Sequence, residues 1–197
     1  MTDRRGGGAN TLRIIGGEWR GRKLRFQANP QLRPTPDRVR ETLFNWLTAH
    51  VHGARCLDLF AGSGALGLEA LSRGAQYCSF VELDRRAASS IRTHLETLGC
   101  SNAGVHNESA QSFLSAARDT GEGFDLVFLD PPFSEDLLPG ICAALEQGEW
   151  LNPETLIYLE SPRRSPPPST PEAWRQTREK EAGEVRYQLF VREPRIV

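Results

Sequence analysis

The sequence predicts an α/β fold built on a doubly wound, mostly parallel β-sheet. Between Arg55 and Glu160, short apolar runs alternate with longer amphipathic segments, as strands joined by crossover helices require. The first of these runs leads into a glycine-rich turn, Asp58 to Gly67, which opens a helix. Two alternating segments around Gly183 then predict a closing antiparallel hairpin. At 197 residues and 39% hydrophobic content, the chain can fill one sizeable core.

Periodicity and turn residues place the elements of this region. We expect strands at Cys56–Phe60, Tyr77–Val81, Ala103–His106, Asp125–Leu129 and Leu156–Glu160. We expect helices at Ala65–Ser72, Arg85–Leu98, Ser109–Arg118 and Glu135–Gln147. The proline-rich stretch from Ser161 to Pro171 predicts an extended connector outside any helix or central strand, and the closing hairpin pairs Arg175–Glu181 with Val185–Arg192.

The segment before the sheet predicts a tail, a basic arm and a helix. Residues 1–11 are rich in glycine and charge, so we expect a mobile tail. Residues 12–34 predict a β-hairpin, Leu12–Ile15 with Arg22–Phe26, followed by a loop. Residues 35–197 form the main domain, in which Thr35 is expected to cap a helix with Pro36 at its first position.

The charge of the chain is unevenly distributed, although the net charge is only −1. Ten Arg or Lys stand against four Asp or Glu in residues 1–45, and acidic residues are in excess afterwards. The basic end is therefore the candidate nucleic-acid face. Its candidate RNA-binding residues are Arg20, Arg22, Lys23, Arg25, Arg33 and Arg38.

Composition also bears on compartment and metal content. No apolar run reaches the length of a membrane span and no apolar leader follows the N-terminus, so we expect a cytoplasmic protein without membrane contact. The four cysteines are dispersed, and no two have the spacing of a zinc or redox pair. We therefore expect reduced, buried thiols and no metal site.

The glycine-rich turn predicts a site for a cofactor that contains adenosine. Gly62 and Gly64 allow a ligand to approach the backbone, and Glu82 ends the next strand, where it can accept hydrogen bonds from ribose hydroxyls. The same glycines with Gly67 also satisfy the dinucleotide fingerprint, so a nicotinamide enzyme stays open. Asp58 favours S-adenosylmethionine, because a carboxylate suits a cationic ligand and repels a pyrophosphate.

A second turn, Asp130-Pro131-Pro132-Phe133, predicts the chemistry. Two prolines stiffen the backbone, so the Asp130 carboxylate and the Pro131 carbonyl can both accept hydrogen bonds from one amino group. Phe133 offers a ring on which a base can stack. Acceptors that hold both hydrogens of an aromatic amine would favour pyramidal nitrogen and aim it at an electrophilic methyl group.

Together with the N-terminal segment, these turns resemble the RsmD family of 16S ribosomal RNA guanine-(2-amino) methyltransferases. The resemblance covers nearly the whole chain, and its most specific part is the Arg38 to Asn45 segment joined to Asp-Pro-Pro-Phe. It implies a Rossmann-like class I S-adenosylmethionine-dependent methyltransferase with a mostly parallel seven-stranded sheet and an antiparallel C-terminal hairpin. The implied substrate is one guanine, conventionally nucleotide 966, on a largely assembled small subunit. We expect the enzyme to act as a monomer.

The resemblance also implies a role for each site residue. Asp130, Pro131, Pro132 and Phe133 would form the catalytic turn, and Glu82 would accept hydrogen bonds from the ribose. Ser109 and Ala110 would lie beside the adenine. The cofactor-binding set is Asp58, Phe60, Gly62, Ser63, Gly64, Glu82, Leu83, Ser109 and Ala110.

Other functions stay open on the sequence. DNA amino-methyltransferases use a similar acid or amide followed by two prolines and an aromatic residue, although this chain leaves no room for a separate DNA-recognition domain. Protein glutamine methylation and a non-catalytic RNA-binding assembly factor are further alternatives. A nicotinamide oxidoreductase lacks a candidate catalytic His, Tyr or Lys beside these turns.

Overall fold

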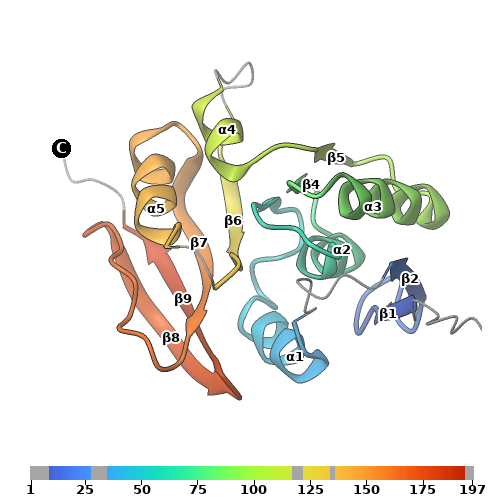
Figure 1. The fold of residues 1–197 in the computed structure, drawn as a ribbon, viewed down its shortest axis with the longest axis horizontal. Coiled ribbons are helices and arrows are strands. Elements are labelled where there is room, and N and C mark those ends of the chain that lie inside the picture. Colours follow the sequence, from blue (N-terminus) through green and yellow to red (C-terminus); the bar gives the residue numbers. More distant parts are fainter. Residues whose placement is uncertain (1–8, 28–34, 117–121, 134–135, 194–197) are drawn as a thin grey trace, which may run out of the picture.

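The computed structural model describes residues 9–27, 35–116, 122–133 and 136–193 (Figure 1). These residues form a seven-stranded sheet, in the order β5-β4-β3-β6-β7-β9-β8, and a separate two-stranded hairpin. The strands of the sheet are β3 (Arg55–Asp58), β4 (Tyr77–Val81), β5 (Ala103–His106), β6 (Phe124–Leu129), β7 (Leu151–Pro162), β8 (Trp174–Ala182) and β9 (Val185–Arg192). The hairpin and helices are β1 (Ala9–Arg13), β2 (Lys23–Gln27), α1 (Asp37–Trp46), α2 (Ala65–Ser72), α3 (Arg85–Leu98), α4 (Ala110–Ser115) and α5 (Leu138–Gln147).

The sheet has the predicted topology. Strands β5, β4, β3, β6 and β7 are parallel, and β9 inserts antiparallel between β7 and β8. The predicted mostly parallel sheet with an antiparallel C-terminal hairpin is confirmed.

Alternating side chains of the central strands supply two cores, one on each face of the sheet. On β6, Phe128 points to the core that α1, α2 and α3 cover, whereas Val127 and Leu129 point to the core under α4 and α5. Figure 1 shows α1 and α2 on one side of β6 and α4 and α5 on the other. Both faces are covered there, which explains why the central strands β4 and β6 are mostly apolar along their length.

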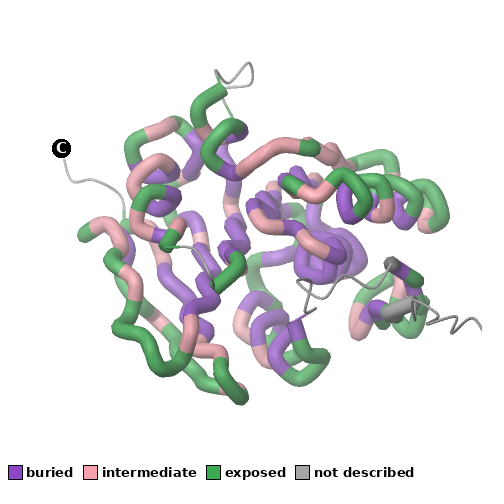
Figure 2. The backbone as a smooth tube through the Cα atoms, viewed as in Figure 1, coloured by how far each residue is buried: buried purple, intermediate pink, exposed green. Residues whose placement is uncertain are grey.

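Helix α2 is buried along its whole length (Figure 2). It lies between the sheet and the N-terminal segment, and its polar residues bind that segment. Ser72 donates to the Gly16 carbonyl at 2.6 Å and accepts from the Trp19 amide at 2.9 Å. The Glu69 carboxylate accepts from the amides of Ile15 and Gly16 at 2.9 and 2.7 Å. The turn of the hairpin is therefore fixed to the helix that follows the glycine loop.

The N-terminal hairpin differs in extent from the prediction. Its strands pair Ala9–Arg13 with Lys23–Gln27, so β1 begins within the expected tail and ends before Ile14 and Ile15. These two residues instead enter the turn docked on α2, where the Ile14 amide still donates to the Arg22 carbonyl at 3.0 Å. The rest of the expected tail, residues 1–8, lies outside the described residues.

Several boundaries inside the sheet domain also differ. Strand β3 ends at Asp58, two residues early, because the chain then turns into the glycine loop. Strand β7 begins at Leu151 and not at Leu156, with a register shift opposite Phe124 to Leu126. Positive φ at Glu154 marks this irregularity, and the segment Asn152-Pro153-Glu154 interrupts the apolar run at the start of the strand.

Strand β7 also continues beyond its expected end. It takes in Ser161 and Pro162, the first two residues of the expected connector, and Pro162 occupies its last position opposite Val185. A proline is tolerated there because it is the last residue of the strand.

Two helices are shorter than predicted. Helix α4 begins at Ala110 with Ser109 as its cap, and it ends at Ser115. Helix α5 begins at Leu138 with a proline in its first turn, where a missing amide hydrogen costs little. The expected ends at Arg118 and Glu135 lie outside the described residues. Within the described ranges, no helix is long and apolar enough to cross a membrane.

Candidate active site

Four acidic residues gather at the carboxyl edge of the parallel sheet. Asp58 ends β3, Glu82 follows β4, Asp130 follows β6, and Glu160 lies near the end of β7. Asp58 pairs with Phe80 of β4 and Phe128 of β6, so the segments that follow these strands start side by side. This edge is where parallel α/β sheets bind their ligands.

The glycine loop occupies the step between β3 and α2. The Gly64 amide donates to the Ala61 carbonyl at 2.7 Å, and Ala61 donates to the Val81 carbonyl at 3.0 Å, which anchors the loop to the neighbouring strand. Gly62 and Gly64 have φ values of 53° and 80°, a backbone conformation that favours glycine. Of the other predicted contacts in the loop, Ser63 is buried and Phe60 is half-buried.

Asp58 is hydrogen-bonded to the backbone of the segment that follows the glycine loop. Its carboxylate is only 2% exposed, and Oδ2 accepts a hydrogen bond from the Gly67 amide at 3.0 Å. Burial raises the pKa of Asp58 to about 7, and the neighbouring charges of Asp130 and Glu82 add to the shift. Its negative charge at neutral pH is therefore costly unless a cation lies nearby.

Glu82 reaches back to the same loop. Its Oε2 accepts from the Gly62 amide at 2.6 Å, and Oε1 accepts from the Asp84 amide at 2.7 Å. Burial raises the pKa of Glu82, and the two amide donors partly offset the shift. Beside it, Leu83 is an apolar side chain that is 72% exposed. The pair thus presents a carboxylate and an apolar surface at the rim, which suits a ribose and its adenine.

Ser109 and Ala110 begin α4. The Ser109 hydroxyl accepts from the Ser112 amide at 3.0 Å, and Ala110 is buried. Asn107, just before them, donates its side-chain amide to the carbonyls of Glu82 and Leu83 at 2.9 and 3.0 Å. The start of α4 is therefore tied to the ends of β4 and β5. The adenine contact expected of Ser109 stays a prediction.

The Asp130 turn begins one residue after β6 ends. Asp130 is half-buried, Pro131 is buried, and Pro132 and Phe133 are exposed. The Phe133 side chain is 43% exposed, which leaves a ring face available at the surface. The Asp130 Oδ2 accepts from the Thr35 hydroxyl at 3.3 Å.

Sequence reasoning missed the partners of Asp130. Thr35 does not cap α1, because Pro36 occupies the cap position and no side-chain cap bond forms there. Both predictions for this helix start are wrong, since the Thr35 hydroxyl turns toward Asp130 and Pro36 precedes the first helical residue. Glu160 and Tyr158 were expected only as strand residues. A buried acid at the end of an apolar strand was the available signal.

Five of the six predicted RNA-binding residues lie on the surface. Arg20, Arg22, Lys23 and Arg25 are exposed on the hairpin and its turn, and Arg38 is exposed in the first turn of α1. The opposite face of the hairpin buries Leu12, Leu24 and Phe26 in the core. Arg33 lies outside the described residues.

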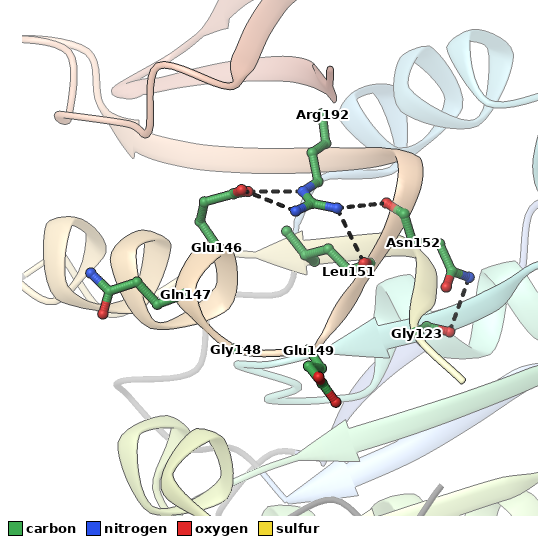
Figure 3. Close-up of a pocket in the computed structure, with 8 residues that line it drawn as sticks. All are labelled: Gly123, Glu146, Gln147, Gly148, Glu149, Leu151, Asn152 and Arg192. Carbon is green, nitrogen blue, oxygen red and sulfur yellow. Dashed lines mark hydrogen bonds and ion pairs between the residues drawn. The ribbon is translucent and has the colours of Figure 1, made fainter. Parts of the chain in front are cut away.

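A surface hollow lies at the opposite end of the sheet, around the amino ends of β6 and β7 (Figure 3). Arg192 crosses it and is held by the Glu146 carboxylate at 2.9 and 3.0 Å and by the carbonyls of Leu151 and Asn152 at 3.4 and 3.5 Å. Its polar groups join β9 to α5 and β7. The hollow is remote from the glycine loop along the strands, so it does not belong to the candidate active site.

In the part of the chain that the structure describes, no group of three His, Cys, Asp or Glu side chains is arranged to hold a metal ion. The four cysteines are free thiols, three of them buried.

The fold and the carboxyl edge together define a class I S-adenosylmethionine-dependent methyltransferase. Asp58, Glu82 and Asp130 are close enough for the charges of the other two to raise the pKa of Asp58. Such an edge attracts a cationic sulfonium and disfavours the pyrophosphate of a nicotinamide cofactor. The glycine loop, the Glu82 carboxylate and the exposed Leu83 fit the rest of the cofactor.

Comparison with known proteins identifies the family. Residues 12–191 match the family described as "Conserved hypothetical protein 95". The chain is 50% identical over 186 residues to ribosomal RNA small subunit methyltransferase D of Escherichia coli, which covers 94% of this chain and 92% of that protein. The protein of the same name from Haemophilus influenzae is 48% identical over 91% of this chain and 93% of its own length. The solved structure of yhhF from Escherichia coli is 48% identical with a TM-score of 0.86, covering 93% of this chain and 99% of that one. The chain belongs to the RsmD family.

Proposed function

We propose that this protein transfers a methyl group from S-adenosylmethionine to the exocyclic 2-amino group of a guanine in 16S ribosomal RNA. Its family makes it an S-adenosylmethionine-dependent methyltransferase of small-subunit ribosomal RNA. The guanine amino group is the finer part of the proposal. By resemblance, the nucleotide is guanine 966 on an assembled small subunit, and the enzyme acts as a monomer in the cytoplasm.

The observation that carries the proposal is the position of the Asp130 turn beside the glycine loop. The Leu59 amide, at the start of that loop, donates to the Phe128 carbonyl at 3.2 Å, two residues before Asp130. A carboxylate, a rigid proline carbonyl and an exposed ring thus stand next to the cofactor loop. These groups match a flat base with an exocyclic amine.

The reaction requires little acid or base strength from the protein. When bound, the cofactor supplies a methyl group whose bond to sulfur breaks as its bond to the guanine nitrogen forms, leaving the electron pair on sulfur and one amino proton to depart. Asp130 and the Pro131 carbonyl accept hydrogen bonds from the two amino hydrogens and direct the nitrogen lone pair toward the methyl carbon. The Asp130 carboxylate is then placed to take the departing proton. Phe133 holds the unstacked base.

The test compares two aspartates of one loop region. We expect Asp130→Ala to lower the rate of methyl transfer to small subunits that lack the mark by about 100- to 1000-fold, the range for losing one transition-state hydrogen-bond partner. The affinity for S-adenosylmethionine, measured by calorimetry, should change by no more than a few fold. Asp136→Ala, which removes an exposed carboxylate beyond the turn, is the control and should leave both quantities unchanged.

Mass mapping of the product identifies the base and the atom. Methyl label on the 2-amino group of a guanine in 16S RNA supports the proposal. Label on an adenine, on DNA or on protein glutamine would refute the substrate assignment. Loss of cofactor binding in Asp130→Ala would refute the role of the turn.

A further inference from the structure

Glu160 lies beside Asp130 at the carboxyl edge of the parallel sheet. Strands β6 and β7 are parallel neighbours, and Leu129 pairs with Leu159, so the next residue of each strand extends in the same register. Phe128 and Tyr158 point into the core beneath α1, and residues two positions further along the strands point the same way. Asp130 and Glu160 are therefore on one side of the sheet, facing the segment that carries Thr35.

Glu160 is buried, Asp130 is half-buried, and hydroxyl groups contact both of them. Glu160 is 3% exposed, and its Oε1 accepts a hydrogen bond of 2.7 Å from the Tyr158 hydroxyl. The Thr35 hydroxyl faces both acids, because it donates to Asp130 and its hydrogen bonding also lowers the pKa of Glu160. Tyr187, on β9, pairs with Glu160 across the strands. Among the residues that the structure describes, no Lys, Arg or His forms an ion pair with either carboxyl group.

Two adjacent carboxyl groups cannot both be ionised easily unless a cation lies beside them. Burial and the charge of Asp130 raise the pKa of Glu160 well above its usual value. Burial also raises the pKa of Asp130, but hydrogen bonds from Thr35 and Glu160 counteract that rise. These effects favour the proton on Glu160 and the negative charge on Asp130.

The Tyr158 hydroxyl donates to one oxygen of Glu160, and the Thr35 hydroxyl donates to Asp130. With the proton on Glu160, its second oxygen would donate to Asp130. Two donors on the protein side fix the orientation of the Asp130 carboxylate. Its remaining lone pairs are available to an incoming amine.

We propose that Glu160 is a positioning residue that donates a hydrogen bond to Asp130 and orients its carboxylate toward the target amino group. The proposal rests on the proposed role of Asp130. It extends that role to Thr35 and Tyr158, which fix the two ends of the chain of hydrogen bonds. It gives the end of β7 a part in a reaction that the Asp-Pro-Pro-Phe turn was expected to perform alone.

The test separates a donor from a charged or merely structural group. Glu160→Gln keeps a donor toward Asp130 and an acceptor toward Tyr158, so we expect kcat within a few fold of the original protein. Glu160→Ala removes the donor, so kcat should fall about 10- to 100-fold with little change in the KM for RNA, because Asp130 loses its alignment. Glu184→Ala, which removes an exposed carboxylate in the β8–β9 turn, is the matched control and should behave like the original protein.

The pH profile supplies a second readout that a structural role would not move. The acid limb of kcat/KM reports protonation of Asp130. Losing the donor in Glu160→Ala raises the pKa of Asp130, so the acid limb should move to higher pH, and Thr35→Val should move it in the same direction. The limb should stay in place in Glu160→Gln. The groups facing the pair that could also contribute are Tyr158, Tyr187 and Asp58.

Two outcomes would overturn the proposal. One is a Glu160→Gln protein whose kcat is as low as that of Glu160→Ala. The other is an acid limb of kcat/KM that stays at the same pH in both Glu160→Ala and Thr35→Val. If Glu160→Ala fails to fold, Glu160→Gln and Thr35→Val still decide between these outcomes. In an Asp130→Ala background, Glu160→Ala should lower the residual kcat no further, whereas a full-activity Asp130→Ala protein would refute the proposed function itself.

Discussion

Glu69 joins the N-terminal hairpin, α1 and α2 in one buried polar cluster, and its replacement should be severe. The Glu69 carboxylate is fully buried and accepts hydrogen bonds from the Ile15 and Gly16 amides, from Arg73 at 2.8 Å and from Arg40 at 3.4 Å. Glu69→Ala would leave both amides and the buried Arg40 guanidinium without this acceptor.

The expected cost follows from the burial of the partners. Arg40 is 1% exposed, and it retains bonds to the Arg13 carbonyl and to Asp37 at 2.9 and 2.6 Å. Arg73 is 21% exposed, so water can partly replace its lost partner. Breaking a buried ion pair by removing one partner costs about 3–5 kcal/mol. We expect Glu69→Ala to lower the free energy of unfolding by that amount, a large share of the roughly 5–15 kcal/mol of a typical domain.

Urea unfolding followed by circular dichroism measures this change. The control is Glu193→Ala, which breaks an exposed pair with Arg175 and should cost about 0–1 kcal/mol. A loss in Glu69→Ala no larger than in the control would show that the cluster does not hold the hairpin. The gain in the free energy of unfolding on adding S-adenosylmethionine should also be compared between Glu69→Ala and the original protein. A smaller gain in Glu69→Ala would show that the change at the N-terminal segment also affects the glycine loop.

Two further predictions concern the cofactor edge and the basic arm. The pKa of Asp58 is raised from about 3.8 to about 7 in the fold, so its contribution to stability is present at acid pH and is lost as the pH rises toward and through 7. Asp58→Asn should therefore unfold at higher urea than the original protein at pH 8 but not at pH 4, while its affinity for S-adenosylmethionine falls; equal stability gains at both pH values would contradict this. Replacing Arg22 and Lys23 together by alanine should reduce the steepness with which RNA affinity falls with salt, by up to about one unit per lost phosphate contact. An unchanged salt slope in filter-binding or fluorescence titrations would remove these residues from the RNA face.

Local sequence patterns were sufficient for the features that depend on neighbouring residues. Short apolar runs that alternate with amphipathic segments along the chain predicted the parallel strands, because a strand buried on both faces is mostly apolar. Gly62, Gly64 and the Asp130 turn could be found because each is a short segment whose backbone demands particular residues. The same reasoning failed at the start of β7, where the polar residues Asn152 to Glu154 and an irregular register interrupt the apolar run.

The tertiary structure alone decided which distant groups meet. Thr35 looked like a helix cap, since its hydroxyl and the following proline satisfy a local rule, but its bond to Asp130 spans 95 residues of sequence. Glu160 lies beside Asp130 only because β6 pairs with β7. Glu69 contacts the hairpin only because the turn of the hairpin docks on α2. The sequence by itself determined the elements and the reactive turn, whereas the protonation and orientation of that turn depend on strand register and burial, which no local pattern encodes.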